Sequence, residues 1–141
     1  MTDEQIIRTK LEKIKGMFQH PTLGLFEDLF TEDCDYITFN GQHLKGIEEN
    51  FDAHVHLSNL KLFRGAVLES DLLQIKFVNP DTAIVIATGG IRFRWQKQLP
   101  QSRRSINTNV FIRQQNGDWK IASFQNSRIR KPGWLQRLLS K

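Results

Sequence analysis

Apolar residues recur at helical spacing in the first part of the chain and at alternate positions in most of the rest. The first group predicts an amphipathic helix over residues 3–19 and consists of Ile7, Leu11, Ile14 and Phe18. Thr2, with Gln5 three residues later, matches a capping box at the start of this helix. Similar groupings predict two further helices, over residues 22–30 and 47–58.

The remaining segments predict a β-sheet. Residues 34–39, 62–79 and 82–95 are rich in β-branched and aromatic side chains, which favour strands. The apolar phase changes near residues 70–71, and such a change within one strand indicates a bulge.

A hairpin over residues 105–126 is the strongest local signal. Asn116-Gly117 separates two alternating runs, and this pair tolerates the positive φ of a hairpin turn. Trp119 and Ile121 share one side of the second arm, because side chains alternate along a strand. On the first arm, one set of side chains predicts a dimer-facing surface, formed by Asn107, Asn109, Phe111 and Arg113.

Several segments resemble one superfamily in their order and spacing. They are LFTEDCDY at 29–36, Gly41, LKGI at 44–47, VFIR at 110–113 and GDWKIA at 117–122. Together they resemble the nuclear transport factor 2-like, or SnoaL-like, domains, and within these the SgcJ/EcaC-type branch. The resemblance makes residues 1–128 one domain and leaves residues 129–141 as a basic, amphipathic tail.

This resemblance implies an α+β fold of the cystatin-like type. Its members have a cone-shaped, curved antiparallel sheet packed against three N-terminal helices, with a cavity between them and a dimer through the sheet. The superfamily includes dehydratases, ketosteroid isomerases, polyketide cyclases, binding proteins and association domains, so the fold does not determine the function. The SgcJ/EcaC-type branch further implies a bacterial protein.

Composition adds limits on location and core. Ten Phe and three Trp suit a core that surrounds a cavity. The sequence has no apolar run of about 18 residues, so no transmembrane helix is expected. Its N-terminus lacks the apolar region of a signal peptide, and the lone Cys34 excludes an intramolecular disulfide. We therefore expect a cytoplasmic protein.

Charge is unevenly distributed within a net charge of +5. Up to Ile91 there are 8 Lys and Arg against 14 Asp and Glu, a net of −6, and from Arg92 onward 12 against one, a net of +11. An anionic partner is one explanation: nucleic acid, a lipid surface or a phosphorylated ligand. We favour acidic helices that pack beside a basic sheet and tail, or two copies that meet through complementary surfaces. For the tail itself we favour packing of Trp134 and its leucines, Leu135 among them, on the body or on a second subunit, and we expect neither nucleic-acid nor membrane binding.

Candidate catalytic residues are His54, Asp35 and Tyr36. His54 lies three residues after Phe51 and seven after Ile47, so a helix turns it toward the core, where it can act as general acid or base. Asp35 can abstract a proton near the mouth of a pocket, and Tyr36 can donate a hydrogen bond. The alternatives are a hydrogen-bonded core histidine, a turn-stabilising carboxylate and a packed tyrosine.

Candidate ligand-pocket residues are Arg92, Trp95 and Asn126, because family members line their cavity from the corresponding strands. For Arg92 the alternative is a solvated sheet face. The sequence contains no metal-binding motif and no nucleotide-binding glycine loop, so we expect no metal and no cofactor.

Two functions remain open from these observations. One is a pocket protein that binds a small hydrophobic organic molecule and transforms it by isomerase, dehydratase or cyclase chemistry. The other is a non-catalytic, homodimeric association module that presents the basic tail to a protein or anionic partner.

Overall fold

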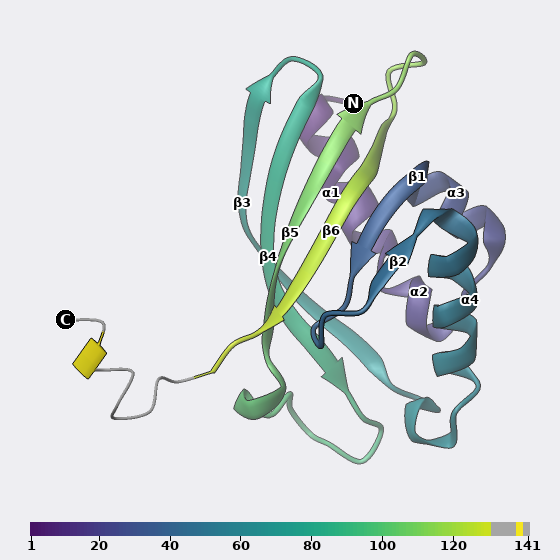
Figure 1. Ribbon diagram of the computed structural model, residues 1–141, viewed down its shortest axis with the longest axis vertical. Coiled ribbons are helices and arrows are strands. Elements are labelled where there is room, and N and C mark those ends of the chain that lie inside the picture. Colours follow the sequence, from purple (N-terminus) through teal and green to yellow (C-terminus); the bar gives the residue numbers. More distant parts are fainter. Residues whose placement is uncertain (131–137, 140–141) are drawn as a thin grey trace.

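Helices cover one face of a six-stranded sheet in the computed structural model, which describes residues 1–130 and 138–139 (Figure 1). The helices are α1 (Asp3–Lys13), α2 (Gly16–Gln19), α3 (Leu23–Leu29) and α4 (Gly46–Ser58), with 3-10 turns η1 (Lys61–Phe63) and η2 (Gln101–Arg103). The strands are β1 (Phe30–Ile37), β2 (His43–Lys45), β3 (Val67–Asn79), β4 (Thr82–Arg92), β5 (Ser105–Arg113) and β6 (Trp119–Arg128).

The first predicted helix is divided into α1 and α2. Its capping box is present, since the Thr2 hydroxyl accepts from the Gln5 N–H at 3.2 Å and the Gln5 side chain accepts from the Thr2 N–H at 2.8 Å. Gly16 then starts α2, which lies close to α3: a Cβ added at Gly16 would lie 3.3 Å from the Leu25 side chain. The missing side chain allows the helices to meet at this corner.

Strand order in the sheet is β2-β1-β6-β5-β4-β3. Four of the five neighbouring pairs are antiparallel, and β1 pairs parallel with β6. The predicted curved sheet packed on N-terminal helices is confirmed, and the sheet is mixed instead of wholly antiparallel. Side-chain alternation does not depend on strand direction, so the sequence pattern could not show the parallel pair.

Strands β3 and β4 pair along most of their length, with a register shift between Leu72 and Gln74. The predicted bulge lies within about two residues of this shift. Gly89 has a separate role, because a Cβ there would clash with the Glu69 carbonyl oxygen on β3. The two backbones therefore come closer at this point than any side chain would permit.

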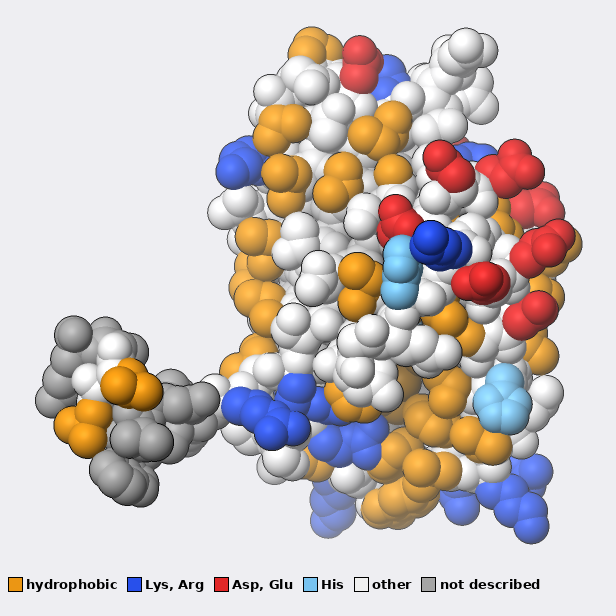
Figure 2. Space-filling model, viewed as in Figure 1, with side chains coloured by type: hydrophobic (Ala, Val, Ile, Leu, Met, Phe, Trp, Pro, Cys, Tyr) orange, Lys and Arg blue, Asp and Glu red, His pale blue; other side chains and the backbone are white. Residues whose placement is uncertain are grey.

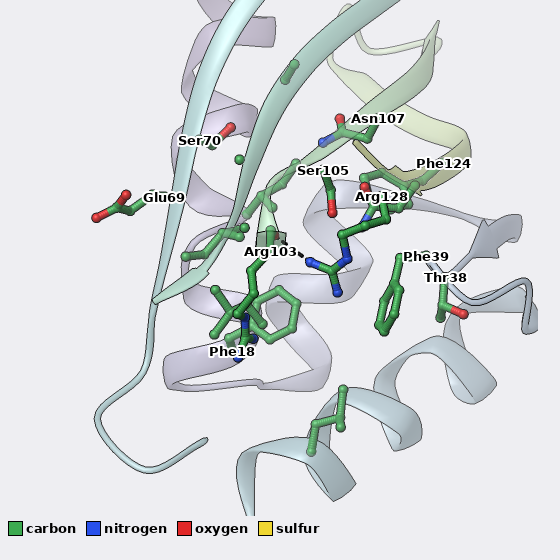
Figure 3. A pocket seen from close by; sticks show the side chains of 18 of the residues that line it. Phe18, Thr38, Phe39, Glu69, Ser70, Arg103, Ser105, Asn107, Phe124 and Arg128 are labelled. Carbon is green, nitrogen blue, oxygen red and sulfur yellow. Dashed lines mark hydrogen bonds between the residues drawn. The ribbon is translucent and has the colours of Figure 1, made fainter. Parts of the chain in front are cut away.

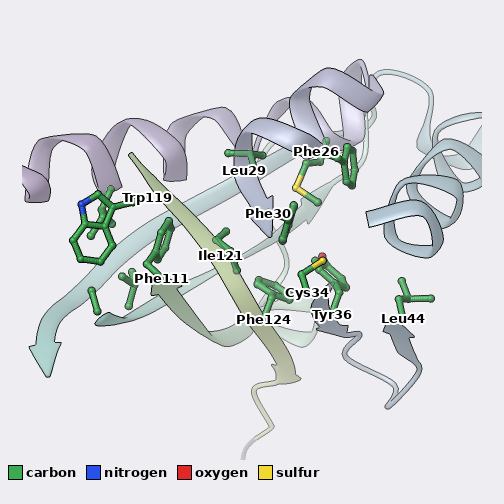
Figure 4. Packing of buried hydrophobic residues seen from close by; sticks show 14 residues of the cluster. Phe26, Leu29, Phe30, Cys34, Tyr36, Leu44, Phe111, Trp119, Ile121 and Phe124 are labelled. Atoms are coloured by element: carbon green, nitrogen blue, oxygen red, sulfur yellow. The ribbon is translucent and has the colours of Figure 1, made fainter. Parts of the chain in front are cut away.

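The core fills the end of the sheet near the β5–β6 turn (Figure 4). Trp119, Ile121 and Phe111 are fully buried against α1 and α3, where Phe26 and Leu29 are also fully buried. Each such side chain contributes about 1.5–3 kcal/mol relative to an exposed position. These side chains pack against one another between the sheet and the helices at this end.

The two faces of β5 are the reverse of the prediction. Asn109 and Phe111 are buried on the inner face, while Ile106 is exposed and Val110 is half-buried on the outer face. The assignment of Asn107, Asn109, Phe111 and Arg113 to a dimer surface was therefore wrong in its facing. Polar residues on this strand point inward, because that part of the sheet lines a cavity.

Lys10 ties α1 to α3 and to the β5–β6 turn. Its ammonium group donates to Asp28 Oδ1 at 3.0 Å, to the Asp28 carbonyl at 2.7 Å and to Asp118 Oδ2 at 2.8 Å. The Lys10 side chain is 5% exposed, so a charge inside the molecule is compensated by two partly exposed carboxylates.

Most of the predicted tail segment, including Trp134 and Leu135, lies outside the described residues. Leu138 and Leu139 are described and are both exposed. No helix in the described part of the chain has the length and apolar character needed to cross a membrane.

Candidate functional site

A cavity of about 640 Å³ lies at the end of the sheet opposite the packed core (Figure 3). Apolar side chains from helices, η1 and strands form most of its wall: Leu11, Ile14, Phe18, Tyr36, Leu44, Leu57, Leu62, Phe63, Phe93 and Phe124. Its size falls in the range of about 300–1,000 Å³ that is usual for small-molecule sites.

Short polar side chains on the inner face of β5 create this space. Ser105, Asn107 and Asn109 stand at alternate positions before Phe111, so the wall recedes where the core would otherwise continue. Asn109 is 1% exposed and its amide donates to Asn107 Oδ1 at 2.7 Å. The Oδ1 atoms of Asn109 and Asn126 are buried without a partner in the described structure. A bound molecule can supply the missing donors.

His54 lies in the wall with a fixed tautomer. Its Nδ1 is 2.8 Å from the Asn50 carbonyl oxygen, which can only accept, so Nδ1 carries the proton and Nε2 is left as an acceptor. The rings of Phe18, Phe26 and Tyr36 surround it, with centroids 5.0 to 5.3 Å away. Burial lowers the pKa of His54 to about 4, so the imidazole is neutral at pH 7.

Tyr36 stands beside His54 and presents a phenol to the cavity. It stacks on Phe124 with ring centroids 4.3 Å apart and is 8% exposed. Burial raises its pKa above the ordinary value for a phenol, so the hydroxyl keeps its proton at neutral pH and can donate to a ligand.

Three of the six predicted site residues lie outside the cavity lining. Asp35 is bonded to His43 Nε2 at 2.7 Å, and its side chain is 50% exposed. Arg92 donates to Glu69 at 2.7 Å, and Trp95 is 58% exposed. Asp35 directly precedes Tyr36 on β1, and alternation sends it to the opposite face. The predicted residues that the cavity brings together are His54, Tyr36 and Asn126.

Sequence reasoning missed the basic and polar lining. Arg103, Arg128 and Arg130 reach the cavity from η2, from the end of β6 and from the residues just beyond it. Arg103 follows a segment without periodicity, so nothing in the pattern indicated it. The inward turn of Asn107 and Asn109 was readable from their shared parity with Phe111, the largest apolar residue of that strand.

Few acidic groups are available for chemistry in the cavity. Among the described residues, Glu69 is the single carboxylate in the lining, and it is paired with Arg92. The described part of the chain also contains no cluster of three or more His, Cys, Asp or Glu able to hold a metal ion. The cavity instead offers one imidazole acceptor, one phenol donor, amides and guanidiniums.

Comparison with known proteins gives structural relatives. No family model and no curated protein matches the sequence. A domain of unknown function with a cystatin-like fold from Nostoc punctiforme is 26% identical, with a TM-score of 0.80 over 98% of this chain and 83% of that one.

Two further structures are similar at lower identity. A nuclear transport factor 2-like protein with a cystatin-like fold from Novosphingobium aromaticivorans is 20% identical, with a TM-score of 0.75 over 99% of this chain and 89% of that one. A ketosteroid isomerase-like protein from Erwinia carotovora atroseptica is 12% identical, with a TM-score of 0.65 over 92% of this chain and 95% of that one. These relatives do not distinguish the SgcJ/EcaC-type branch from others.

Proposed function

We propose that the cavity binds a small hydrophobic organic molecule. The cystatin-like fold of the nuclear transport factor 2-like superfamily, which this chain has, supports the proposal. The observation that carries the proposal is an aromatic-lined cavity in which buried polar atoms, Oδ1 of Asn109 and of Asn126 among them, have no partner in the described structure. A buried oxygen without a donor costs free energy, and a ligand with matching donors offsets that cost.

Binding is better supported than proton transfer. His54 Nε2 can accept a hydrogen bond and the Tyr36 hydroxyl can donate one, so a hydroxyl and a carbonyl on the ligand both find partners. A histidine whose pKa is about 4 is a weak base at pH 7, and the lining carboxylate Glu69 is occupied by Arg92. Isomerase, dehydratase or cyclase chemistry would depend on His54 as the base, which makes it the less favoured extension.

A neutral fluorescent probe tests the binding proposal. N-Phenyl-1-naphthylamine brightens in apolar sites, and we expect a saturable signal with one site per chain. Asn107→Phe fills the cavity from β5 and should weaken binding about 10-fold or more. Thr108→Phe adds the same bulk on the opposite, exposed side of the strand and is the matched control. Absence of saturable binding, or equal binding by Asn107→Phe, refutes the proposal.

Homodimerisation through the outer face of the sheet is a second proposal. Ile84 and Val110 are opposite each other on β4 and β5, and Ile106 nearby is 38% exposed. Apolar side chains are spread over this face in Figure 2. Val110→Lys should give monomers in sedimentation velocity, whereas Gln115→Lys, in the exposed β5–β6 turn, should not. A wild-type monomer at all concentrations contradicts this proposal.

The association-module alternative depends on the basic tail. Removing residues 129–141 should abolish recovery of a partner while leaving the thermal unfolding of the body unchanged. Full partner recovery by the shortened chain would rule out a role of the tail in association.

A further inference from the structure

Two arginines at one end of the cavity have no carboxylate beside them. Arg103 ends η2 and Arg128 ends β6, and both line the cavity. Three other arginines do have carboxylate partners: Arg92 with Glu69 at 2.7 Å, Arg104 with Asp71 at 3.7 Å and Arg113 with Asp3 at 2.7 Å. Arg94, outside the cavity lining, donates instead to the carbonyl oxygens of Lys61 and Arg64. Within the described residues, no carboxylate lies within 4.0 Å of Arg103 or Arg128.

The two guanidinium groups are held in place by rings. Arg103 Cζ lies 3.8 Å from the centre of the Phe93 ring, and Arg128 Cζ lies 4.3 Å from the centre of the Phe39 ring. Stacking covers the flat face of a guanidinium and leaves its N–H edges free for an oxyanion. The Arg103 Nε atom is buried without an acceptor in the described structure.

The backbone also fixes this pair. Arg128 donates from Nη1 to the carbonyl oxygen of Arg103, a contact drawn in Figure 3. Gly90 permits the approach of this segment to β4, because a Cβ there would lie 2.7 Å from the Arg103 carbonyl oxygen. Figure 3 shows the Ser105 hydroxyl pointing toward the Arg128 side chain. The donors are therefore preorganised before any ligand arrives.

Two like charges that line one end of the same cavity repel each other unless a counter-charge is present. Burial lowers the pKa of Arg103, and the charge of Arg128 lowers it further. An anion between the two guanidiniums would offset both effects and satisfy the free N–H groups at once. A cationic ligand would find no such partner, because the carboxylate of Glu69 is bonded to Arg92.

We propose that Arg103 and Arg128 form the subsite for a carboxylate or phosphate group on an otherwise apolar ligand. The inference rests on the proposed binding function and adds the charge class of the molecule bound. The anionic group lies at the basic end, and the apolar body extends along Phe18, Tyr36 and His54. In Figure 2, Lys and Arg side chains gather at the same end of the molecule, where the chain leaves β6.

A matched pair of dyes tests this subsite. 1-Anilinonaphthalene-8-sulfonate and N-phenyl-1-naphthylamine share one aromatic body, and only the first carries an anionic group. Wild-type protein should bind the anionic dye more tightly, and its affinity should fall as salt rises. Arg103→Gln with Arg128→Gln should weaken the anionic dye about 10-fold or more, while the neutral dye is unchanged. Arg104→Gln removes the same charge next to the site, outside the lining, and should have no effect.

Each other result has a distinct meaning. Wild-type binding of neither dye refutes the pocket function and the subsite together. Neutral-dye binding with no preference for the anion, or no salt dependence, refutes the subsite alone. If the double variant binds neither dye at an unchanged melting temperature, the arginines shape the cavity but do not select for a negative charge. That result also overturns the proposal. If the double variant unfolds, the salt dependence of the wild type decides.

Competition with dodecanoate, dodecyl phosphate and dodecanol identifies the anionic group. Dodecanoate displacing the anionic dye at lower concentration than dodecyl phosphate supports a carboxylate ligand, and the reverse order supports a phosphate. If dodecanol displaces the dye at the same concentration as either anion, the subsite does not select for a negative charge and the proposal is contradicted.

Discussion

Replacement of His54 should remove a large part of the acid sensitivity of the fold. The pKa of His54 is about 4 in the folded protein, because burial disfavours the charged ring, against 6.5 ordinarily. The folded state therefore binds fewer protons than the unfolded state between these values, and stability from this group is present above pH 6.5 and lost as pH falls toward 4. From about pH 7.5 to about pH 4.5 the loss is about 2–3 kcal/mol.

Urea unfolding across this pH range measures the effect. Wild type should lose about 2–3 kcal/mol more than His54→Gln between the two pH values, since glutamine does not titrate. His56→Gln, two residues along the same helix and exposed, should follow the wild-type profile. Parallel profiles for wild type and His54→Gln would refute the buried, neutral imidazole and with it the acceptor role of Nε2.

Three further outcomes follow from packing and burial. Lys10→Met should cost about 2–4 kcal/mol in urea unfolding, because it leaves two carboxylates without their shared partner, whereas the half-exposed Lys13→Met should cost less than about 1 kcal/mol. Gly89→Ala should cost about 2 kcal/mol or more through its backbone clash, while Gly24→Ala, with open space around it, should be neutral or stabilising. Cys34 is fully buried and its pKa is raised to about 11, so alkylation at about pH 8 should be about 100-fold slower in the folded than in the unfolded chain. Equal costs within either pair of variants, or equal alkylation rates, would contradict the respective inference.

Local signals in the sequence were sufficient for the elements of the fold. The capping box at Thr2 and the hairpin around Gly117, whose φ is +85°, depend on neighbouring residues alone, and both are present. The direction of β1 beside β6 depends on where α3 ends in the folded molecule. That position is set by tertiary contacts. A single sequence carries no local pattern for that direction.

Residues that line the cavity could be named from the sequence where position along a helix or strand determined which way the side chain faces. His54 and Tyr36 reach the cavity because helical spacing and strand alternation place them on the inner side. Arg92 and Trp95 were assigned from strand membership alone, and the chain beyond Gly90 turns them elsewhere. Arg103 enters through a loop whose path is determined by contacts far away in the sequence.

The packed core and the cavity both lie against the inner face of the sheet. The size of the inward side chains determines where the core ends and the cavity begins. Along the inner face of β5, Ser105, Asn107 and Asn109 are short and polar, and Phe111 begins the filled region. On β4 the same face carries the small residue Ala87 over the cavity. If hydrophobic burial alone governed these positions, larger apolar residues there would give more stability. Small polar residues at inward positions forgo that stability, which is expected of a surface that has to accommodate a ligand with polar groups.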